Sequence, residues 1–263
     1  MVAIFGLLTD FGERDPYRGQ LASVLLRRSP SCQILDLSHQ VEPHNILQGA
    51  FFLRACWPHL PQGCIVAAVV DPGVGGSRDI LLFCSGGEYV LAPDNGLLEL
   101  LLRGIPTDGL WRLRTERYPH RSNTFHGRDL FAPLAADLAE TRDPDRLGER
   151  LSLDDLVRLP VGEAELTGDR LEARVLHVDR FGNCVLNIPE SDWRDYSRGQ
   201  RGVALLEPMS RSLAMVRAYS DIPADGVGLL PGSQGYLELA VDRASCAKRL
   251  GLSSGDRVVI SLT

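Results

Sequence analysis

The sequence contains no C-x-x-C pair, although it has six cysteines among its 263 residues. The cysteines are widely spaced and mostly lie among apolar residues. Closely paired cysteines are typical of structural zinc sites and redox motifs, so neither kind of site is indicated. We expect buried thiols in a reducing compartment, and therefore a cytoplasmic protein.

An excess of positive charge and a long hydrophobic run are also missing. The formal net charge is -6 and the arginines are spread along the chain, which gives no electrostatic basis for binding nucleic acid or an anionic membrane. The amino-terminal stretch MVAIFGLLTDFG lacks a basic region and is too short to cross a bilayer, so neither a signal peptide nor a membrane anchor is expected. With 44% hydrophobic residues, the chain can form a core in one large or two modest domains.

The stretch Ile65–Arg78, IVAAVVDPGVGGSR, organises the first half of the chain. Its apolar, β-branched beginning has no period-two alternation, which predicts a strand buried on both faces of a parallel sheet. Asp71 would then lie at the carboxyl end of that strand, where ligands collect in open α/β sheets. The glycines that follow permit a tight turn, across which Arg78 could pair with Asp71 in fork geometry.

Two simpler interpretations of this loop compete with a functional one. Gly73–Gly75 begins like the dinucleotide motif G-x-G-x-x-G, but Arg78 stands at the third glycine position. The next segment, Ile80–Cys84, is predicted to be a strand, whereas the motif requires a helix. The loop could also be a structural turn with a surface ion pair. Further polar loops shift the balance toward function.

Residues 1–150 are predicted to form an α/β domain. Strands alternate with helical segments, and Asp15 with Pro16 is expected to begin the first helix as N-cap and first helical residue. The alternation is the signature of a doubly wound sheet flanked by helices. Strands are expected at Val2–Leu8, Ile34–Leu37, Ile65–Val70, Ile80–Cys84 and Tyr89–Leu91, and helices at 16–28, 45–57 and 130–140.

The composition changes after this domain. Charged residues crowd the range 151–170, which is predicted to be a linker region. Residues 171–263 contain short strand-like runs separated by Gly and Pro, which predict a smaller, antiparallel β-barrel-like domain. The runs are Arg174–Val178, Val185–Ile188, Val203–Leu206, Leu213–Ala218, Tyr236–Val241 and Val258–Leu262.

Polar loops follow several predicted strands. Asp10 follows the first strand and Asn95 follows the fifth, so both are expected at the same sheet edge as the Ile65 strand's carboxyl end. His126 lies just before a helix in TFHGRD, where capping by its neighbours is the simpler interpretation. His39 and His44 lie in another loop and are weak candidates, because a histidine in a polar loop is commonly an ordinary surface residue.

Six motifs in this order resemble one family. They are TDFG at Thr9–Gly12, DPGVGGSR at Asp71–Arg78, PDNG at Pro93–Gly96, TFHGRD at Thr124–Asp129, DRFGN at Asp179–Asn183 and SQGYLELA at Ser233–Ala240. The chain resembles the S-adenosylmethionine (SAM) hydroxide adenosyltransferases, which are related to enzymes that fluorinate or chlorinate the same substrate. The resemblance extends over nearly the whole chain.

The resemblance implies an enzyme that cleaves SAM to adenosine and methionine through attack of water or hydroxide at C5′, without a metal or a cofactor. By this analogy, Asp71, Arg78 and His126 prepare the water, and Asp10 holds the ribose hydroxyls. The remaining candidates for substrate binding are Asp15, Asn95, Phe125, Asp179, Phe181, Asn183, Ser233 and Tyr236, of which Asp179 and Ser233 match groups on the methionine moiety. A homotrimer is also implied, with the substrate between the amino-terminal domain of one subunit and the carboxyl-terminal domain of its neighbour.

Departures from the halide-using relatives favour the water-using branch. Halide-using members carry a non-acidic group where this chain has Asp71, because a buried carboxylate would repel an anion. Fluorinating members also carry a serine near the position of Gly127 and a longer insertion between the counterparts of Arg78 and Asn95. A SAM-dependent halogenase is thus the nearer alternative.

Two alternatives come from other functional classes. A metal-dependent hydrolase could use Asp10, Asp15, Asp71 and His126 as ligands, but the usual metal-binding spacings are missing and Arg78 would stand beside the cation. A non-catalytic module could bind SAM without turnover. The presence of Asp71, Arg78 and His126, the residues that prepare the water by analogy with the family, argues against such a module.

Overall fold

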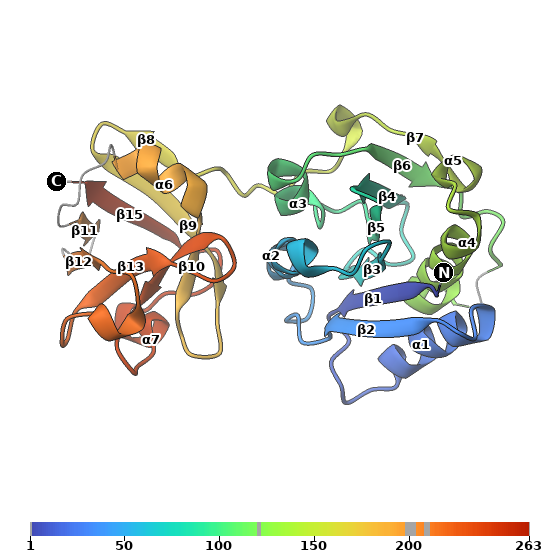
Figure 1. The fold of residues 1–263 in the computed structure, drawn as a ribbon, viewed down its shortest axis with the longest axis horizontal. Coiled ribbons are helices and arrows are strands. Elements are labelled where there is room, and N and C mark those ends of the chain that lie inside the picture. The colour runs from blue at the N-terminus through green and yellow to red at the C-terminus, as the bar shows by residue number, and fades with distance from the viewer. Residues whose placement is uncertain (1, 120–121, 198–203, 208–210, 263) are drawn as a thin grey trace. The chain divides into compact units, whose positions relative to one another are not determined.

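The structure is a computed structural model that describes residues 2–119, 122–197, 204–207 and 211–262. The chain divides into two compact units, Met1–Leu159 and Pro160–Thr263 (Figure 1). The division lies inside the range 151–170 that the sequence predicts as a linker. The carboxyl part of that range belongs to the second unit, because β8 (Glu165–Thr167) pairs with β9 (Arg170–Val178).

The first unit is built on one mixed sheet with the order β2-β1-β3-β5-β4-β6-β7. β1, β2, β3 and β5 are parallel to one another, whereas β4 is antiparallel to both of its neighbours and β7 is antiparallel to β6. The parallel half explains the unbroken apolar run of β3, whose five residues are all buried. The strands are β1 (Ile4–Thr9), β2 (Gln33–Ser38), β3 (Ile65–Val69), β4 (Ile80–Ser85), β5 (Glu88–Pro93), β6 (Gly109–Leu113) and β7 (Gly148–Arg150).

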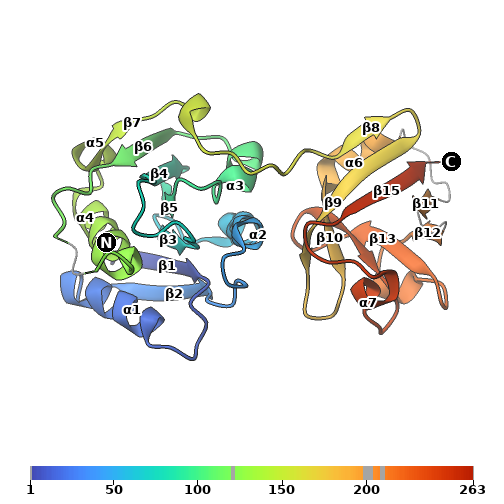
Figure 2. The same cartoon turned by 180° about the vertical axis from the view of Figure 1, so that it is seen from behind.

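Helices cover both faces of this sheet. On one face, α1 (Tyr17–Arg28) and α4 (Ala132–Thr141) share a core with alternate residues of β3. On the other face, the turn after α2 (Ile46–Cys56) places the Trp57 ring 5.4 Å from the Phe83 ring, and α2 contacts α3 (Glu99–Gly104). The two pairs of helices lie on opposite sides in Figure 1 and in the reverse view of Figure 2. The doubly wound α/β architecture predicted from the sequence is therefore present.

Some local predictions for this unit are wrong. Asp15 does not cap α1, because the helix begins at Tyr17 with Pro16 in the cap position and without a side-chain cap bond. The aspartate therefore stands one residue too early. Asn45 does cap α2, where its side chain accepts a hydrogen bond from the backbone of Gln48 at 3.0 Å. The elements α3, α5 (Pro144–Leu147), β6 and β7 were not anticipated.

The second unit is a barrel. Its strands follow the order β10-β14-β13-β12-β11-β15-β9-β8, and β9 also pairs with β10, so the ring closes on itself among the described residues. The strands besides β8 and β9 are β10 (Cys184–Pro189), β11 (Ala204–Glu207), β12 (Arg211–Met215), β13 (Val227–Pro231), β14 (Tyr236–Ala240) and β15 (Arg257–Leu262). The helices α6 (Glu190–Ser197) and α7 (Cys246–Leu250) accompany them. The predicted run at 203–206 begins at Val203, which lies outside the described residues.

The barrel departs from the predicted antiparallel pattern at one place. β12 and β13 pair in parallel, because the chain between Met215 and Val227 crosses over through a 3-10 turn (Tyr219–Asp221) instead of reversing in a hairpin. β13 was itself missed in the sequence. Among the described helices of both units, none combines the length and the apolar character needed to cross a membrane.

Two glycines of the first unit test how closely the helices pack. A Cβ at Gly49 of α2 would lie 2.8 Å from Leu97 Cδ1 and 3.0 Å from Val70 Cγ2, whereas nothing lies within 4 Å of a Cβ at Gly19 of α1. We expect Gly49→Ala to lower the free energy of unfolding by about 1–3 kcal/mol through overpacking. Gly19→Ala, its control, should raise it by about 0.5 kcal/mol through helix propensity. Denaturant unfolding measures both, and equal effects would contradict the tight contact at Gly49.

Candidate active site

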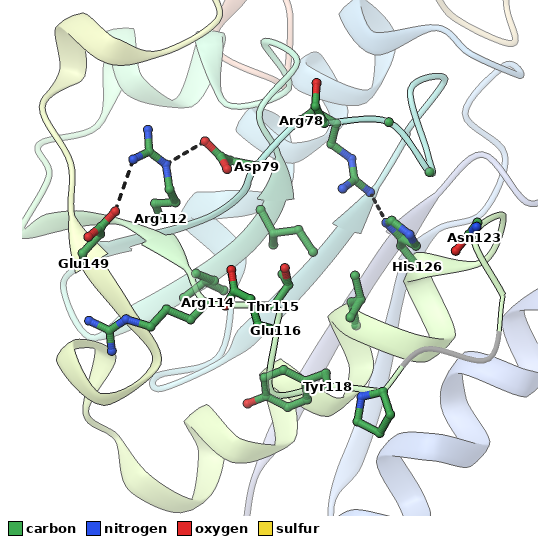
Figure 3. Close-up of a pocket in the computed structure, with 17 residues that line it drawn as sticks. Arg78, Asp79, Arg112, Arg114, Thr115, Glu116, Tyr118, Asn123, His126 and Glu149 are labelled. Carbon is green, nitrogen blue, oxygen red and sulfur yellow. Dashed lines mark hydrogen bonds and ion pairs between the residues drawn. The ribbon is translucent and has the colours of Figure 1, made fainter.

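Arg78 joins Asp71 and His126 into one hydrogen-bonded trio. The Arg78 Nε donates to both carboxylate oxygens of Asp71, at 3.2 Å and 2.9 Å, and its Nη2 donates to Asp71 Oδ2. The same Nη2 lies 2.8 Å from His126 Nδ1 (Figure 3). The structure thus brings together the three residues that the resemblance assigns to preparing the water.

The contact with Arg78 determines which nitrogen of His126 carries the proton. A guanidinium group has only donors, so His126 Nδ1 must accept the hydrogen bond. A neutral His126 therefore carries its proton on Nε2. In this arrangement His126 can donate from Nε2, and it can accept a further proton only by giving up the bond to Arg78.

The backbone around the trio is held by close contacts. Asn95 Nδ2 donates to the carbonyl of Val70 at 2.9 Å, which secures the residue before Asp71. Gly75 has φ +82, and a Cβ there would lie 2.5 Å from the carbonyl oxygen of Asn123, so the loop from Asp71 to Arg78 packs directly on the segment before His126. Asn95, which was predicted to bind substrate, here stabilises the backbone next to Asp71.

The trio is less exposed to solvent than a second ion pair on the same cavity. The side chains of Asp71 and Arg78 are 4% and 12% exposed, whereas those of Asp79 and Arg112 are 40% and 41% exposed. Both arginines line a cavity of about 880 Å³, which His126 also lines (Figure 3). Charges shielded from water interact more strongly, so the buried pair can act on a bound reactant in a way that the exposed pair cannot.

Asp10 and Asp15 occupy different surroundings. Asp10 Oδ2 accepts a hydrogen bond from the backbone of His44 at 3.0 Å, where His44 adopts φ +68. Asp15 is exposed and lines a separate cavity of about 590 Å³ with Arg18 and His39. The structure does not bring Asp15 to the trio.

Phe125 is buried in an aromatic cluster. Its ring centroid lies 5.7 Å from Phe11 and 5.2 Å from Tyr17, and the Arg128 guanidinium lies 4.9 Å from it. Phe125 precedes a π-helical turn, Gly127–Phe131, that leads into α4. The cluster therefore fixes the chain at His126, and its member Tyr17 was not among the predicted residues.

The turn between β9 and β10 is organised by Asp179. Its Oδ1 accepts from the backbone N–H groups of Phe181 at 2.9 Å and Asn183 at 2.8 Å, and its Oδ2 accepts from Asn183 Nδ2 at 3.0 Å. The Phe181 side chain projects from this turn with the residue 78% exposed. The turn thus presents an aromatic ring while Asp179 and Asn183 maintain its shape.

The segment after β13 holds the other predicted residues of the second unit. Ser233 lies in the turn before β14, where the backbone N–H of Gly232 donates to the carbonyl of Tyr236 at 2.8 Å. Sequence reasoning missed Glu238, which is buried on β14 and accepts a hydrogen bond from the Tyr219 hydroxyl. Burial raises the pKa of the Glu238 carboxyl, and the charge of Asp179 raises it further. A glutamate inside the apolar run YLELA was the signal that could have revealed it.

The candidate metal ligands do not form a cluster. Within the described parts of the chain, no group of three His, Cys, Asp or Glu side chains is arranged to hold a metal ion. Asp10, Asp15, Asp71 and His126, the set considered for a metal-dependent hydrolase, all belong to those parts. The donor set of the trio also contains Arg78, a cation that pairs with Asp71.

Family models match both units of the chain. The model of the SAM hydroxide adenosyltransferase N-terminal domain matches residues 5–148, and that of the C-terminal domain matches residues 173–259. The chain belongs to the SAM hydroxide adenosyltransferase family. The matched ranges contain all the residues of the trio and both turns of the second unit described above.

Individual relatives in this family align with the chain over nearly its full length. An (R)-S-adenosyl-L-methionine hydrolase of Thermus thermophilus is 34% identical over 257 residues, covering 94% of this chain and 95% of that protein. A fluorinase of Nocardia brasiliensis is 26% identical over 290 residues, covering 98% and 97%. The crystal structure of an uncharacterized conserved protein from Thermotoga maritima superposes with a TM-score of 0.88 at 30% identity, covering 98% of this chain and 99% of that one.

The raised pKa of Glu238 predicts a stabilising substitution. A carboxyl group whose pKa is raised by folding adds stability below the ordinary glutamate pKa, and this stability is lost as the pH rises through the raised value. Glu238→Gln stays neutral and keeps an acceptor for Tyr219. We expect it to raise the Tm by roughly 2 °C near pH 8 and to have no effect near pH 4.

Thermal unfolding at the two pH values measures this difference. Glu165→Gln, at an exposed glutamate on β8, is the matched control and should change the Tm at neither pH. A lower Tm for Glu238→Gln near pH 8 would contradict the prediction, because it would mean that the surroundings favour the charged carboxylate.

Proposed function

We propose that this protein hydrolyses SAM to adenosine and L-methionine, with Asp71, Arg78 and His126 as its catalytic residues. The observation that carries the proposal is the largely buried trio, in which one guanidinium holds a carboxylate and an imidazole together. Membership of the SAM hydroxide adenosyltransferase family supports the substrate and the reaction. The more similar of the two relatives described above is a hydrolase, and the fluorinase is more distant.

The reaction needs an activated water and little else. The water oxygen forms a bond to C5′ as the bond between C5′ and sulfur breaks, and the sulfur keeps the electron pair of that bond. Methionine therefore leaves as a neutral thioether and needs no proton from a general acid. The water loses one proton, so the site must stabilise a hydroxide-like oxygen. Neither a metal nor a redox cofactor is required for this balance.

The hydrogen bonds of the trio indicate how its members divide this work. The single lone pair of His126 Nδ1 is occupied by Arg78, whereas Oδ1 of the Asp71 carboxylate has a second lone pair beside its bond to Arg78. Asp71 is therefore the better proton acceptor. Arg78 and the Nε2–H of His126 then supply positive charge and a donor for the developing hydroxide. We assign the base to Asp71 on this basis, an assignment that the sequence left open between Asp71 and His126.

The surroundings of the trio also favour water over a halide ion. A halide would have to enter beside the Asp71 carboxylate, which repels anions. A Cβ at Gly127 would lie 3.2 Å from Phe11 Cζ and 3.3 Å from Phe125 Cε2, so a serine at this position would require both rings to shift. Neither feature suits a halogenating site.

We further infer that the active enzyme is a cytoplasmic homotrimer in which each substrate lies between two subunits. In support of this, the candidate residues are divided between the units: the trio and Asp10 lie in the first, and Asp179 and Ser233 lie in the second. All six cysteines are free thiols, which suits a reducing compartment. By the same proposal, Asp10 binds the ribose hydroxyls, and Asp179 and Ser233 bind the methionine moiety.

Product analysis tests the reaction. The purified protein is incubated with SAM, chloride and a chelator, and the nucleosides are separated by chromatography. We expect adenosine and methionine in equal amounts, because each attack of water at C5′ releases one molecule of each. The chelator should not lower the activity, because no metal takes part. A 5′-chloro nucleoside would assign the protein to the halogenating branch, and loss of activity on chelation would revive the metal-dependent alternative. Bound SAM without any product would point to a non-catalytic module.

Substitutions test the assignment of the trio. Asp71→Asn, Arg78→Ala and His126→Ala should each lower kcat by about 100-fold or more while KM changes little, because these residues act on the attacking water. Asp79→Asn is the matched control, since Asp79 follows Arg78 and pairs with an arginine on the same cavity but is exposed. Wild-type kcat in all three trio variants would refute the assignment.

The subunit arrangement can be tested with two inactive variants. Arg78→Ala removes the first unit's contribution to a site, and Asp179→Ala removes the second unit's contribution. If each site takes one unit from each of two neighbours, every mixed trimer has one intact site in three. An equimolar mixture of the two variants, after subunit exchange, should therefore recover about a quarter of the wild-type activity. Lack of any recovery in mixed trimers would mean that each site is built from a single subunit.

A further inference from the structure

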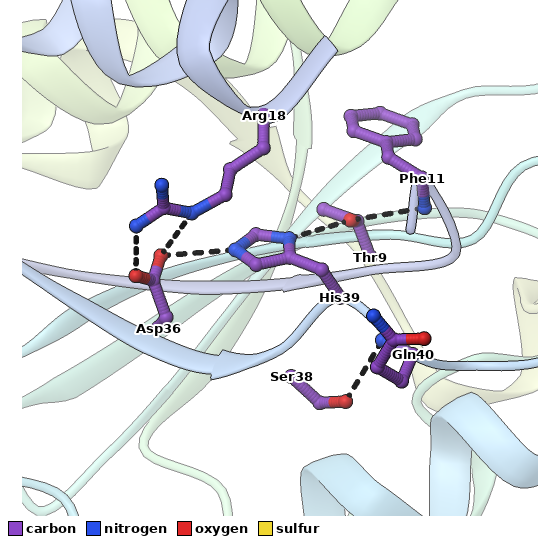
Figure 4. Close-up of polar contacts among 7 residues, drawn as sticks. All are labelled: Thr9, Phe11, Arg18, Asp36, Ser38, His39 and Gln40. Atoms are coloured by element: carbon purple, nitrogen blue, oxygen red, sulfur yellow. Dashed lines mark hydrogen bonds and ion pairs between the residues drawn. The ribbon is translucent and has the colours of Figure 1, made fainter. Parts of the chain in front are cut away.

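Thr9 and His39 form a buried hydrogen bond outside the trio. Thr9 ends β1, His39 follows β2, and Thr9 Oγ1 lies 2.8 Å from His39 Nδ1 (Figure 4). The parallel pairing of β1 with β2 shifts its register between Leu7 and Leu8, and this irregularity brings His39 level with the end of β1. Thr9 is completely buried and His39 is 5% exposed. The bond is therefore shielded from competing water.

The other contacts of His39 assign the direction of this bond. Asp36 accepts from Arg18 Nε at 3.1 Å and lies 2.9 Å from His39 Nε2 (Figure 4). The hydrogen bond from Arg18 holds the pKa of the Asp36 carboxyl below its ordinary value, so this carboxylate is an acceptor and His39 Nε2 carries the proton. A neutral His39 then accepts at Nδ1 from the Thr9 hydroxyl.

These contacts hold the turn that carries Asp10. The Thr9 hydroxyl oxygen accepts from the backbone N–H of Phe11 at 3.2 Å, and the carbonyl of His39 accepts from the backbone N–H of Gly12 at 2.7 Å. Asp10 lies between these two points. Its own carboxylate accepts from the backbone of His44, which belongs to the same loop as His39. The direction of the Asp10 side chain thus depends on how His39 joins the two loops.

We propose that His39 is a positioning residue for SAM binding, which holds the Asp10–Gly12 turn so that the Asp10 carboxylate faces the ribose. This rests on the proposed function, in which Asp10 binds the ribose hydroxyls. His39 acts through Thr9 and the backbone of the turn and does not itself contact the substrate. Its loss should therefore weaken binding and leave the chemistry of the trio in place.

Binding measurements test this role independently of turnover. Calorimetric Kd values for SAM are determined in an Arg78→Ala background, which should slow hydrolysis by about 100-fold or more. Adding His39→Ala or Thr9→Val should raise Kd by about tenfold, because either change removes the bond that orients the turn. In the Arg78-containing enzyme, KM should rise by a similar factor while kcat stays within about threefold. His59→Ala, at an exposed histidine after α2, is the control and should change neither.

Two further variants separate positioning from general stability. His39→Asn offers a carbonyl oxygen near the position of Nδ1 and should recover most of the affinity, whereas His39→Leu fills the space without an acceptor and should not. In combination with Asp10→Ala, His39→Ala should weaken binding no further. Unchanged Kd in His39→Ala, equal defects in the Asn and Leu variants, or full additivity with Asp10→Ala would each overturn the proposal. Absence of adenosine from the wild-type enzyme would overturn the proposed reaction and leave these binding tests valid.

Discussion

The candidate site depends on the hydrogen bonds that the Arg78 guanidinium donates. Its planar set of donors reaches Asp71, seven residues earlier, and His126, 48 residues later. Burying such a pair costs desolvation energy that its mutual attraction often fails to recover, so a buried ion pair alone contributes little to stability. Its presence here is explained by geometry, because one rigid cation fixes both the carboxylate and the imidazole tautomer.

The fold around the trio serves this geometry by local means. Asp71 follows the carboxyl end of β3. Asn95, in the loop after the neighbouring strand β5, donates a hydrogen bond to the carbonyl of Val70, the residue before Asp71. The π-helical turn and the aromatic cluster of Phe11, Tyr17 and Phe125 secure the chain around His126. Each support comes from a different segment, so the site is a product of the whole first unit.

Sequence patterns predicted the parts of this structure that are determined locally. The unbroken apolar run of β3, the glycine-rich turn and the pairing of Asp71 with Arg78 depend on neighbouring residues, and all three are present. The contact between Arg78 and His126 depends on how distant segments pack, which no local pattern encodes. His39 was only a weak candidate for the same reason, because its hydrogen-bond partner Thr9 lies 30 residues away. β13 was missed because its short run VGLLP contains both glycine and proline, which normally interrupt strands.

The closure of the second unit's barrel affects how its turns are supported. The ring closes where β9 meets β10, and the turn of Asp179 connects these same two strands. A hairpin of adjacent strands brings its partners together with little loss of chain entropy, whereas β15 must return from the end of the chain to pair with β9. The turn that presents Phe181 is therefore built from a pairing between two strands that are adjacent in the chain. The shape of this turn can be established before β15 docks. Loss of the pairing between β15 and β9 would open the ring there and leave the pairing of β9 with β10 in place.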